Sequence, residues 1–471
     1  MKKFKKAMAL SLALAMGLSL VACGDKTEDT TATEATETEA ETEAAETEEA
    51  ETSESEVVEV DNEAAVQALV DAATANGKAI HVYSWNEELG SRIDSHFRTK
   101  YPELESLVIY ENLDVSGTGE EYKTGIQNAI NAADDNAPSI VAADNDVALY
   151  FAQQDWAVNL TDIGLTADMY ANAYDFTVEY GTIDGNLKAM TWQCPAGCFV
   201  YRTDVAEDVL GAKTPEEVQE LVKDWDTFLE TAATLKEAGK YMLSGPDDLK
   251  YAFIDQKTSP WVQDGKLNID SCINDYLETS KTMYDNDYTL KSAMWSSEWT
   301  ANMATGDVFG YFGCTWFVQW SLNEESHGMW NVCDGPVSYH WGGSYLTVSN
   351  LCPNNELAAL VIYTLCCDED VMYDLYADDY DFPNNKASVQ RLIADGKGSN
   401  PILGGQDPLV TWDSVGQGIS LENATSYDAT FNGYLDSAAS SYWSGSLDSV
   451  DAAIANIKEQ VANAYSDIVI E

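Results

Sequence analysis

Ala79-Ile80-His81-Val82-Tyr83-Ser84-Trp85 is the stretch that decides the fold, because its mostly apolar run predicts a buried strand. Helical and strand-like segments then alternate at 89–99, 106–110, 120–133, 138–143 and from about 147. The first helix is expected to end before Pro102, since the residue before a proline disfavours the helical conformation. This alternation is typical of a mainly parallel sheet with helices on both faces.

The alternation starts again further along the chain. Strands are predicted at 186–192 and 197–202. Thr214-Pro215-Glu216-Glu217 then opens a helix, because Thr caps it, Pro suits its first turn and the acids complement its dipole. Helix, strand, strand and helix are predicted in turn at 271–304, 308–312, 344–348 and 450–465. Two α/β lobes therefore fit the pattern better than one.

Leu20-Val21-Ala22-Cys23 ends a basic start and an apolar run, which together are typical of a secretory signal. The run, 7–21, is shorter than the roughly 20 residues that span a bilayer. The stretch resembles a bacterial lipobox. That resemblance implies a signal peptide at 1–22 and a mature chain whose first residue, Cys23, carries a diacylglycerol. The alternative is an ordinary signal peptide with a cysteine nearby.

The segment 23–62 is mostly Thr, Glu and Ala, and it has no basic residue after Lys26. Such a composition buries too little apolar area to offset chain entropy, and its like charges repel one another. We expect a disordered acidic tether that holds a folded domain away from a membrane. A tail that binds a metal or a partner is the alternative.

The charge balance excludes some classes of partner. The chain has 471 residues and a formal net charge of −55. Nucleic-acid binding depends on Lys and Arg meeting phosphates, and anionic lipid heads also attract basic segments. We therefore expect no nucleic-acid partner and no electrostatic adhesion to lipid, whereas the 13 Trp and 25 Tyr allow large cores with aromatic rings to spare.

Nine cysteines include Cys23 and leave eight in the folded part. Exported chains can pair cysteines as disulfides, and Cys194 and Cys198 have a spacing that zinc permits. Buried free thiols are the third possibility. No second Cys/His pair has a matching spacing, and the four histidines are scattered, so we expect no metal site and no cofactor.

Several short landmarks, in their order and spacing, resemble the carbohydrate-binding proteins of ABC importers, the maltose-binding-protein-like family. They are the strand through Trp85 and the segments 136–141, 154–160, 183–190, 199–204, 214–215 with 224–226, 303–308 and 341–345. Two features depart from the family pattern. Ser139 replaces the usual Asp, and Cys194 and Cys198 flank what is often a Pro/Gly turn.

The resemblance implies an α/β, two-lobed periplasmic-binding-protein-like fold of type II. The ligand cleft would lie between lobes joined by crossing hinge strands. The first lobe would hold 78–190 plus 305–340, and the second 191–304 plus 341–471. The resemblance also implies a monomeric, non-enzymatic lipoprotein anchored at the extracellular face of the cell membrane, or periplasmic if the envelope has an outer membrane. It would deliver a sugar to an ABC transporter permease.

A sugar cleft needs aromatic rings for the apolar C–H faces, and carboxylates or amides for the hydroxyl groups. Such side chains are expected at strand ends. The candidates at these positions are Trp85, Asn86, Glu87, Asp144, Asp146, Trp192, Trp316, Trp341, Gly342 and Gly343. Asp144 or Asp146 could instead cap the next helix. Trp295 and Trp299 are four residues apart on an expected helix face, and we expect them in the core.

Two other functions stay open. A secreted glycoside hydrolase needs two carboxylates at a set separation, which a sequence does not reveal. A polyamine-binding protein would also use carboxylates and Trp. No Gly-x-Ser-x-Gly, His-Glu-x-x-His or phosphate-binding Gly/Lys loop is present, so a binding protein is favoured over an enzyme.

Overall fold

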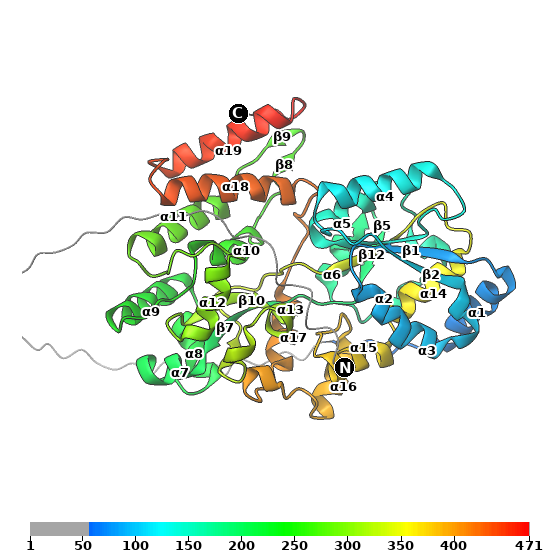
Figure 1. Ribbon diagram of the computed structural model, residues 1–471, viewed down its shortest axis with the longest axis horizontal. Helices are drawn as coiled ribbons and strands as arrows, with labels where there is room; N and C mark the ends of the chain where they lie inside the picture. The colour runs from blue at the N-terminus through cyan, green and yellow to red at the C-terminus, as the bar shows by residue number, and fades with distance from the viewer. Residues whose placement is uncertain (1–55, 471) are drawn as a thin grey trace, which may run out of the picture. The chain divides into compact units, whose positions relative to one another are not determined.

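The computed structural model describes residues 56–470, which lie in one unit of the chain, Thr52–Glu471 (Figure 1). The expected signal peptide, Cys23 and the tether as far as 55 lie outside the described residues. Among 56–470, no helix has the length and apolarity needed to cross a bilayer.

A five-stranded sheet forms the first lobe, in the order β2-β1-β3-β12-β6. Its strands are β1 (Ile80–Ser84), β2 (Val108–Asn112), β3 (Ile140–Asp144), β6 (Ala189–Thr191) and β12 (Ser344–Val348). The strands β2, β1 and β3 run parallel to one another, as the alternating pattern predicts. β12 runs antiparallel between β3 and β6, so the sheet is mixed.

Helices cover both faces of this sheet. Successive residues of β3 face opposite sides: Ile140 and Ala142 pack into one core, and Val141 and Ala143 into the other. The helices of this lobe are α1 (Glu63–Asn76), α2 (Glu88–Arg92), α3 (Arg98–Lys100), α4 (Glu120–Ala132), α5 (Asn145–Ala152), α6 (Asp175–Gly181), α14 (Asn355–Cys366) and α15 (Glu369–Asp379). The segment expected as one helix at 89–99 consists of α2, a π-helical turn at Ile93–Phe97, and α3.

The second lobe is built on an antiparallel sheet in the order β10-β7-β11. Its strands are β7 (Gly197–Arg202), β10 (Gly310–Cys314) and β11 (Trp330–Cys333). Its helices are α7 (Thr203–Val205), α8 (Pro215–Val222), α9 (Trp225–Glu237), α10 (Lys250–Ile254), α11 (Ser271–Asp285), α12 (Ser297–Thr305), α13 (Thr315–Trp320), α16 (Lys386–Ala394), α17 (Leu409–Gly418), α18 (Asp428–Trp443) and α19 (Val450–Ala464). Two small hairpins are also present: one pairs β4 (Thr182–Ile183) with β5 (Asn186–Leu187), and the other pairs β8 (Val262–Gln263) with β9 (Lys266–Leu267). Thr214 caps α8 in a capping box with Glu217, as expected.

Strand pairing corrects the expected division between the lobes. The segment 305–340 was assigned to the first lobe, but its strands β10 and β11 both pair with β7. The segment from 341 was assigned to the second lobe, but β12 pairs with β3 and β6, and α14 packs against α1. The assignment of 305–340 was wrong, and that of 341–471 was wrong for the part from β12 to α15, because strand partners that are distant in sequence are chosen by packing, not by chain order.

Three segments, 192–197, 334–343 and 380–385, cross between the lobes and hydrogen-bond to one another, which confirms the expected crossing strands. The Asn384 N–H donates to the Trp192 carbonyl at 2.9 Å, and the Gly197 N–H donates to the Tyr339 carbonyl at 2.7 Å. The buried Arg92 guanidinium donates to the buried Asp381 carboxylate on the third crossing segment. These contacts fix the base of the space between the lobes.

Residues 56–62, the described end of the expected disordered tether, are attached to the first lobe. There the Val58 N–H donates to Asn172 Oδ1 at 2.9 Å, and Asn172 Nδ2 donates back to the Val58 carbonyl at 3.0 Å.

The eight cysteines from Cys194 to Cys367 are free thiols, and seven of them are buried, which is the third possibility raised above.

Candidate ligand-binding site

A cavity of about 340 Å³ lies between the two lobes. On the first lobe it is lined by the loop before α4, the junction of β3 and α5, and α6. On the second lobe it is lined by α10, the loop before α12, the first turn of α13, the second crossing segment and the chain from 420 to 432. It therefore has the position that the sequence predicts for a ligand cleft.

Aromatic rings form the wall contributed by the second lobe. Trp341 stacks on Tyr251 with ring centres 4.8 Å apart and meets Trp316 edge to face at 4.9 Å. The Trp295 ring is nearly parallel to that of Trp316, with centres 6.1 Å apart and an angle of 11°. The exposed ring of Trp295 and the half-buried ring of Trp316 offer surface on which the C–H face of a sugar can lie.

Gly342 allows this wall to form. Its φ of +77° lies in the left-handed region, which residues with a Cβ rarely adopt. A Cβ at this position would also lie 3.2 Å from Trp316 Nε1, which donates a 2.5 Å hydrogen bond to the Trp341 carbonyl. A side chain at 342 would therefore push the two Trp residues apart.

Asp144 and Asp146 form the facing wall on the first lobe. Asp144 caps α5 by accepting a hydrogen bond from the Asp146 N–H at 3.0 Å, and it also lines the cavity. Burial, with the nearby charge of Asp146, raises the pKa of Asp144 to about 7. Asp146 faces the open cavity, and its side chain is accessible there. The protein around it still removes part of its hydration, which raises its pKa, whereas the charges of Lys250 and His340 act to lower it. The two expected roles of Asp144, cap and lining residue, hold together.

His340 links the wall to the second crossing segment. Its Nδ1 lies 2.6 Å from Asp255 Oδ2, and its backbone N–H donates to the same oxygen at 2.6 Å. The ring of His340 also packs near Phe176 and Tyr180 of the first lobe. Among the described residues, nothing hydrogen-bonds to its buried Nε2.

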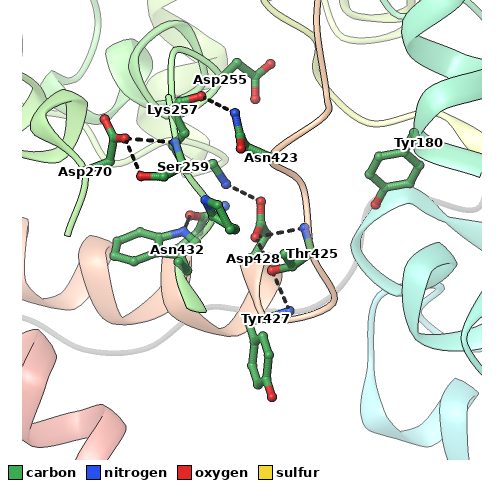
Figure 2. A network of polar contacts seen from close by, with 12 residues as sticks. Tyr180, Asp255, Lys257, Ser259, Asp270, Asn423, Thr425, Tyr427, Asp428 and Asn432 are labelled. Atoms are coloured by element: carbon green, nitrogen blue, oxygen red, sulfur yellow. Dashed lines mark hydrogen bonds and ion pairs between the residues drawn. The ribbon is translucent and has the colours of Figure 1, made fainter. Parts of the chain in front are cut away.

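A polar network stiffens the part of the wall between 423 and 428 (Figure 2). Lys257 Nζ pairs with Asp428, whose other oxygen accepts hydrogen bonds from Thr425 at 2.8 and 3.2 Å. Asn423 Nδ2 donates to the Lys257 carbonyl at 2.9 Å. Tyr180 lies across from this network in Figure 2 and belongs to the first lobe.

One direct contact closes the cavity along its edge. The Leu421 N–H and the Ser420 hydroxyl of the second lobe both donate to Glu179 Oε2 on α6, at 3.1 and 3.4 Å. Because these groups belong to different lobes, opening the cleft would break both hydrogen bonds. Glu179 therefore stabilises the arrangement of lobes seen here.

The structure brings half of the expected site residues together. The residues that line the cavity are Asp144, Asp146, Trp316, Trp341 and Gly342. Gly343 lies just behind them, and its carbonyl accepts a hydrogen bond from the Asn145 N–H at 2.9 Å. Strand ends thus locate part of the site.

The other four candidates lie elsewhere. Trp85 packs on Tyr122 with ring centres 5.7 Å apart, and Asn86 accepts a hydrogen bond from the Glu88 N–H. Glu87 accepts one from Asn112. Trp192 is only 1% exposed, in the core of the first lobe with the Arg92 guanidinium 5.3 Å from its ring. Each of these side chains is engaged in local packing or hydrogen bonding and does not line the cavity.

The two expected core tryptophans differ from each other. Trp299 is 1% exposed, as expected, but Trp295 is 55% exposed and lines the cavity. Trp295 has a φ of +66° and precedes α12, so the two do not share a helix face as their spacing suggested. Sequence reasoning also missed several lining residues that lie on or just after helices, on the second crossing segment and in 420–432: Tyr180, Tyr251, Asp255, Lys257, His340, Asp428 and Asn432.

Comparisons with known proteins identify the fold. A family model described as bacterial extracellular solute-binding protein matches residues 112–401. No curated protein sequence matches the chain. The two-lobed periplasmic-binding-protein-like fold of type II is confirmed by similar solved structures, three of which follow.

The sugar-binding protein MalE of Xanthomonas citri is 15% identical, with a TM-score of 0.65 over 82% of this chain and 97% of that chain. A binding protein of B. animalis subsp. lactis in complex with beta-1,6-galactobiose is 17% identical, with a TM-score of 0.62 over 84% of this chain and 99% of that chain. Maltose-bound MalE3 of T. maritima is 18% identical, with a TM-score of 0.58 over 82% of this chain and 99% of that chain.

Proposed function

This chain belongs to the bacterial extracellular solute-binding proteins, and from that premise we propose that its solute is a sugar, an oligosaccharide, which it delivers to an ABC transporter permease. The protein would bind its ligand between the lobes and release it unchanged. It would therefore act as a receptor and not as an enzyme.

One observation carries the proposal: a wall of aromatic rings faces a wall of acidic and amide groups across the interlobe cavity. Trp295 and Trp316 supply ring surface on one side, beside the stacked pair Trp341 and Tyr251, and Asp144 and Asp146 supply acceptors on the other. A sugar has both kinds of surface, since its C–H faces suit aromatic rings and its hydroxyl groups need donors and acceptors. The similar structures named above include proteins in complex with a galactobiose and with maltose, which supports a sugar as the ligand.

The charge of the cavity explains why a neutral ligand is favoured over a polyamine. Of its four acids, Asp428 is paired with the Lys257 ammonium, and Asp255 Oδ2 is engaged by both the backbone N–H and the Nδ1 of His340. The raised pKa of Asp144 means that this carboxyl is partly protonated near neutrality, when it can donate a hydrogen bond as well as accept one. The cavity therefore offers fewer free negative charges than its composition suggests.

The proposal includes the expected anchor. A signal peptide at 1–22 would be removed, and Cys23 would carry the lipid that holds a monomeric protein at the outer face of the cell membrane. The tether, shortened by the attachment of Val58 to Asn172, would leave from the first lobe. The folded part would then stay close to a permease in the same membrane.

Calorimetric titration with neutral oligosaccharides, polyamines and amino acids tests the function. We expect submicromolar to micromolar binding of at least one oligosaccharide, with no hydrolysis product detected by chromatography after prolonged incubation. Binding of spermidine alone would make the protein a polyamine receptor. Release of monosaccharide would make it a glycoside hydrolase.

A further inference from the structure

A second cavity, of about 560 Å³, lies beside the interlobe cavity. Both cavities are lined by Tyr251 and Trp295, so these two side chains form their common border. All the lining residues of the second cavity belong to the second lobe, in the segment 246–251, in α11, in the loop 291–295 and near the end of α18.

The border residue Trp295 is held in an unusual state. Its φ is +66°, and Lys291 in the same loop has a φ of +61°. Side chains with a Cβ are disfavoured there, and such backbone conformations cluster at ligand-binding sites. The Trp295 side chain is nevertheless 55% exposed, so burial of its ring does not account for this conformation. A ligand that crosses from one cavity to the other would cover that ring.

Aromatic rings line the second cavity as they line the first. Besides Tyr251 and Trp295, it contains Tyr284 and Trp443. The Trp443 Nε1–H donates to Ser280 Oγ at 2.9 Å, and Lys291 Nζ lies 4.2 Å from the centre of the Tyr284 ring. These contacts fix the two rings in place, which makes them suitable platforms for further sugar units.

Two carboxylates in the second cavity have unused hydrogen-bonding capacity. Asp247 Oδ2 accepts from the Met294 N–H at 2.8 Å, and Asp436 Oδ2 accepts from Lys250 Nζ at 2.9 Å. The other oxygen of each carboxylate is buried and accepts no hydrogen bond from any described residue. Buried acceptors without a donor are unfavourable, and hydroxyl groups of a ligand would supply donors.

We propose that the second cavity continues the binding site, so that the ligand is an oligosaccharide that crosses the exposed edge of Trp295 and places further sugar units against Tyr284 and Trp443. This inference rests on the proposed function. The interlobe cavity alone is near the small end of the range of ligand cavities, about 300–1,000 Å³, so it suits only the first part of a long ligand.

The test compares ligand lengths in a chain whose second cavity is filled. Ser440 lines the cavity and is exposed on α18, and Ser437 is exposed on the same helix but lines neither cavity. Ser440→Trp should fill the cavity, and Ser437→Trp is the matched control. The probes are α-1,4- and β-1,4-linked gluco-oligosaccharides and β-1,6-linked galacto-oligosaccharides of two to six units, titrated calorimetrically into each protein.

For the series that binds, we expect the Kd of the wild-type protein to fall at least tenfold between the shortest and the longest members. Ser440→Trp should abolish this gain and leave the Kd of the shortest member within twofold, whereas Ser437→Trp should keep the gain. Equal affinity for all lengths, or a full gain in a folded Ser440→Trp protein, would overturn the inference and leave the proposed function intact. Failure of every series to bind would overturn both.

Discussion

Trp316 and Trp341 are 25 positions apart in the chain, yet the Trp316 indole N–H donates a 2.5 Å hydrogen bond to the Trp341 carbonyl. Trp316 lies in the first turn of α13, which follows β10, and Trp341 lies on the segment that crosses to β12. The hydrogen bond thus joins the second sheet to the hinge and holds the two rings edge to face. It makes the aromatic wall part of the structure that must move when the lobes move.

Trp316→Ala should weaken sugar binding by about 1–3 kcal/mol, because it removes a stacking surface from a half-buried position in the cavity wall. Trp320→Ala, on the same helix but 51% exposed and away from the cavity, should leave the affinity unchanged. Calorimetry measures both. An unchanged affinity in Trp316→Ala, accompanied by a large loss of melting temperature, would show that Trp316 serves the core and not the ligand.

Asp144 should make the stability of the protein depend on pH. Its folded-state pKa is raised from 3.8 to about 7, so the folded state binds its proton more tightly than the unfolded state. The stability that this carboxyl contributes is fully present below pH 3.8 and is lost as the pH rises through 7. Asp144→Asn keeps a neutral helix cap. The free energy of unfolding of Asp144→Asn minus that of wild type should therefore be larger at pH 8.5 than at pH 5, because only the wild type loses this stability as the pH rises.

Urea unfolding at the two pH values checks this expectation for Asp144. Asp467→Asn, at an exposed position near the end of the chain, provides the control and should show little difference between pH 5 and pH 8.5. A difference between Asp144→Asn and wild type that is the same at both pH values would contradict the raised pKa.

Glu179→Ala should favour separation of the lobes, since it removes the acceptor for Leu421 and Ser420 across the cleft. We expect a larger radius of gyration in the ligand-free protein by small-angle X-ray scattering. Sugar affinity should weaken by about 0.5–1.5 kcal/mol. Glu459→Ala, an exposed change on α19, is the control. If the radius and the affinity both match those of the control, the contact does not hold the lobes together.

Replacing Cys23 with Ala should release the mature protein from the membrane without changing its affinity for sugar. The anchor would be covalent lipid, and the binding site lies in the distant folded part. Immunoblots of membrane and soluble fractions measure the first effect, and calorimetry measures the second. Cys352→Ala, in the folded part, should leave the protein in the membrane fraction. A lower affinity of the released form would contradict this division of labour.

Local patterns accounted for much of the fold. The strand that begins near Ile80 and the capped helix that begins at Pro215 both lie where apolar runs and capping residues predict them. Trp316, Trp341 and Asp144 were found because strand and helix ends have local signals, and α/β sheets bind ligands at such ends. The same rule selected Trp85 and Trp192, which pack into the first lobe, because the rule gives position along a strand and says nothing about depth of burial.

The sequence by itself determined the local elements, the two-lobed α/β class and the kinds of side chain that a cleft would need, because these follow from contacts between near neighbours in the chain. Only the tertiary structure decided that β10 and β11 pair with β7, and that Trp295 lies exposed at the border of two cavities and not in the core. It also decided that Tyr251 and Asp428 of the second lobe line the same cavity as Asp144 of the first. These relationships depend on the packing of segments that are far apart in sequence. A local sequence pattern does not specify which distant segment a residue packs against, so the sequence alone does not predict them.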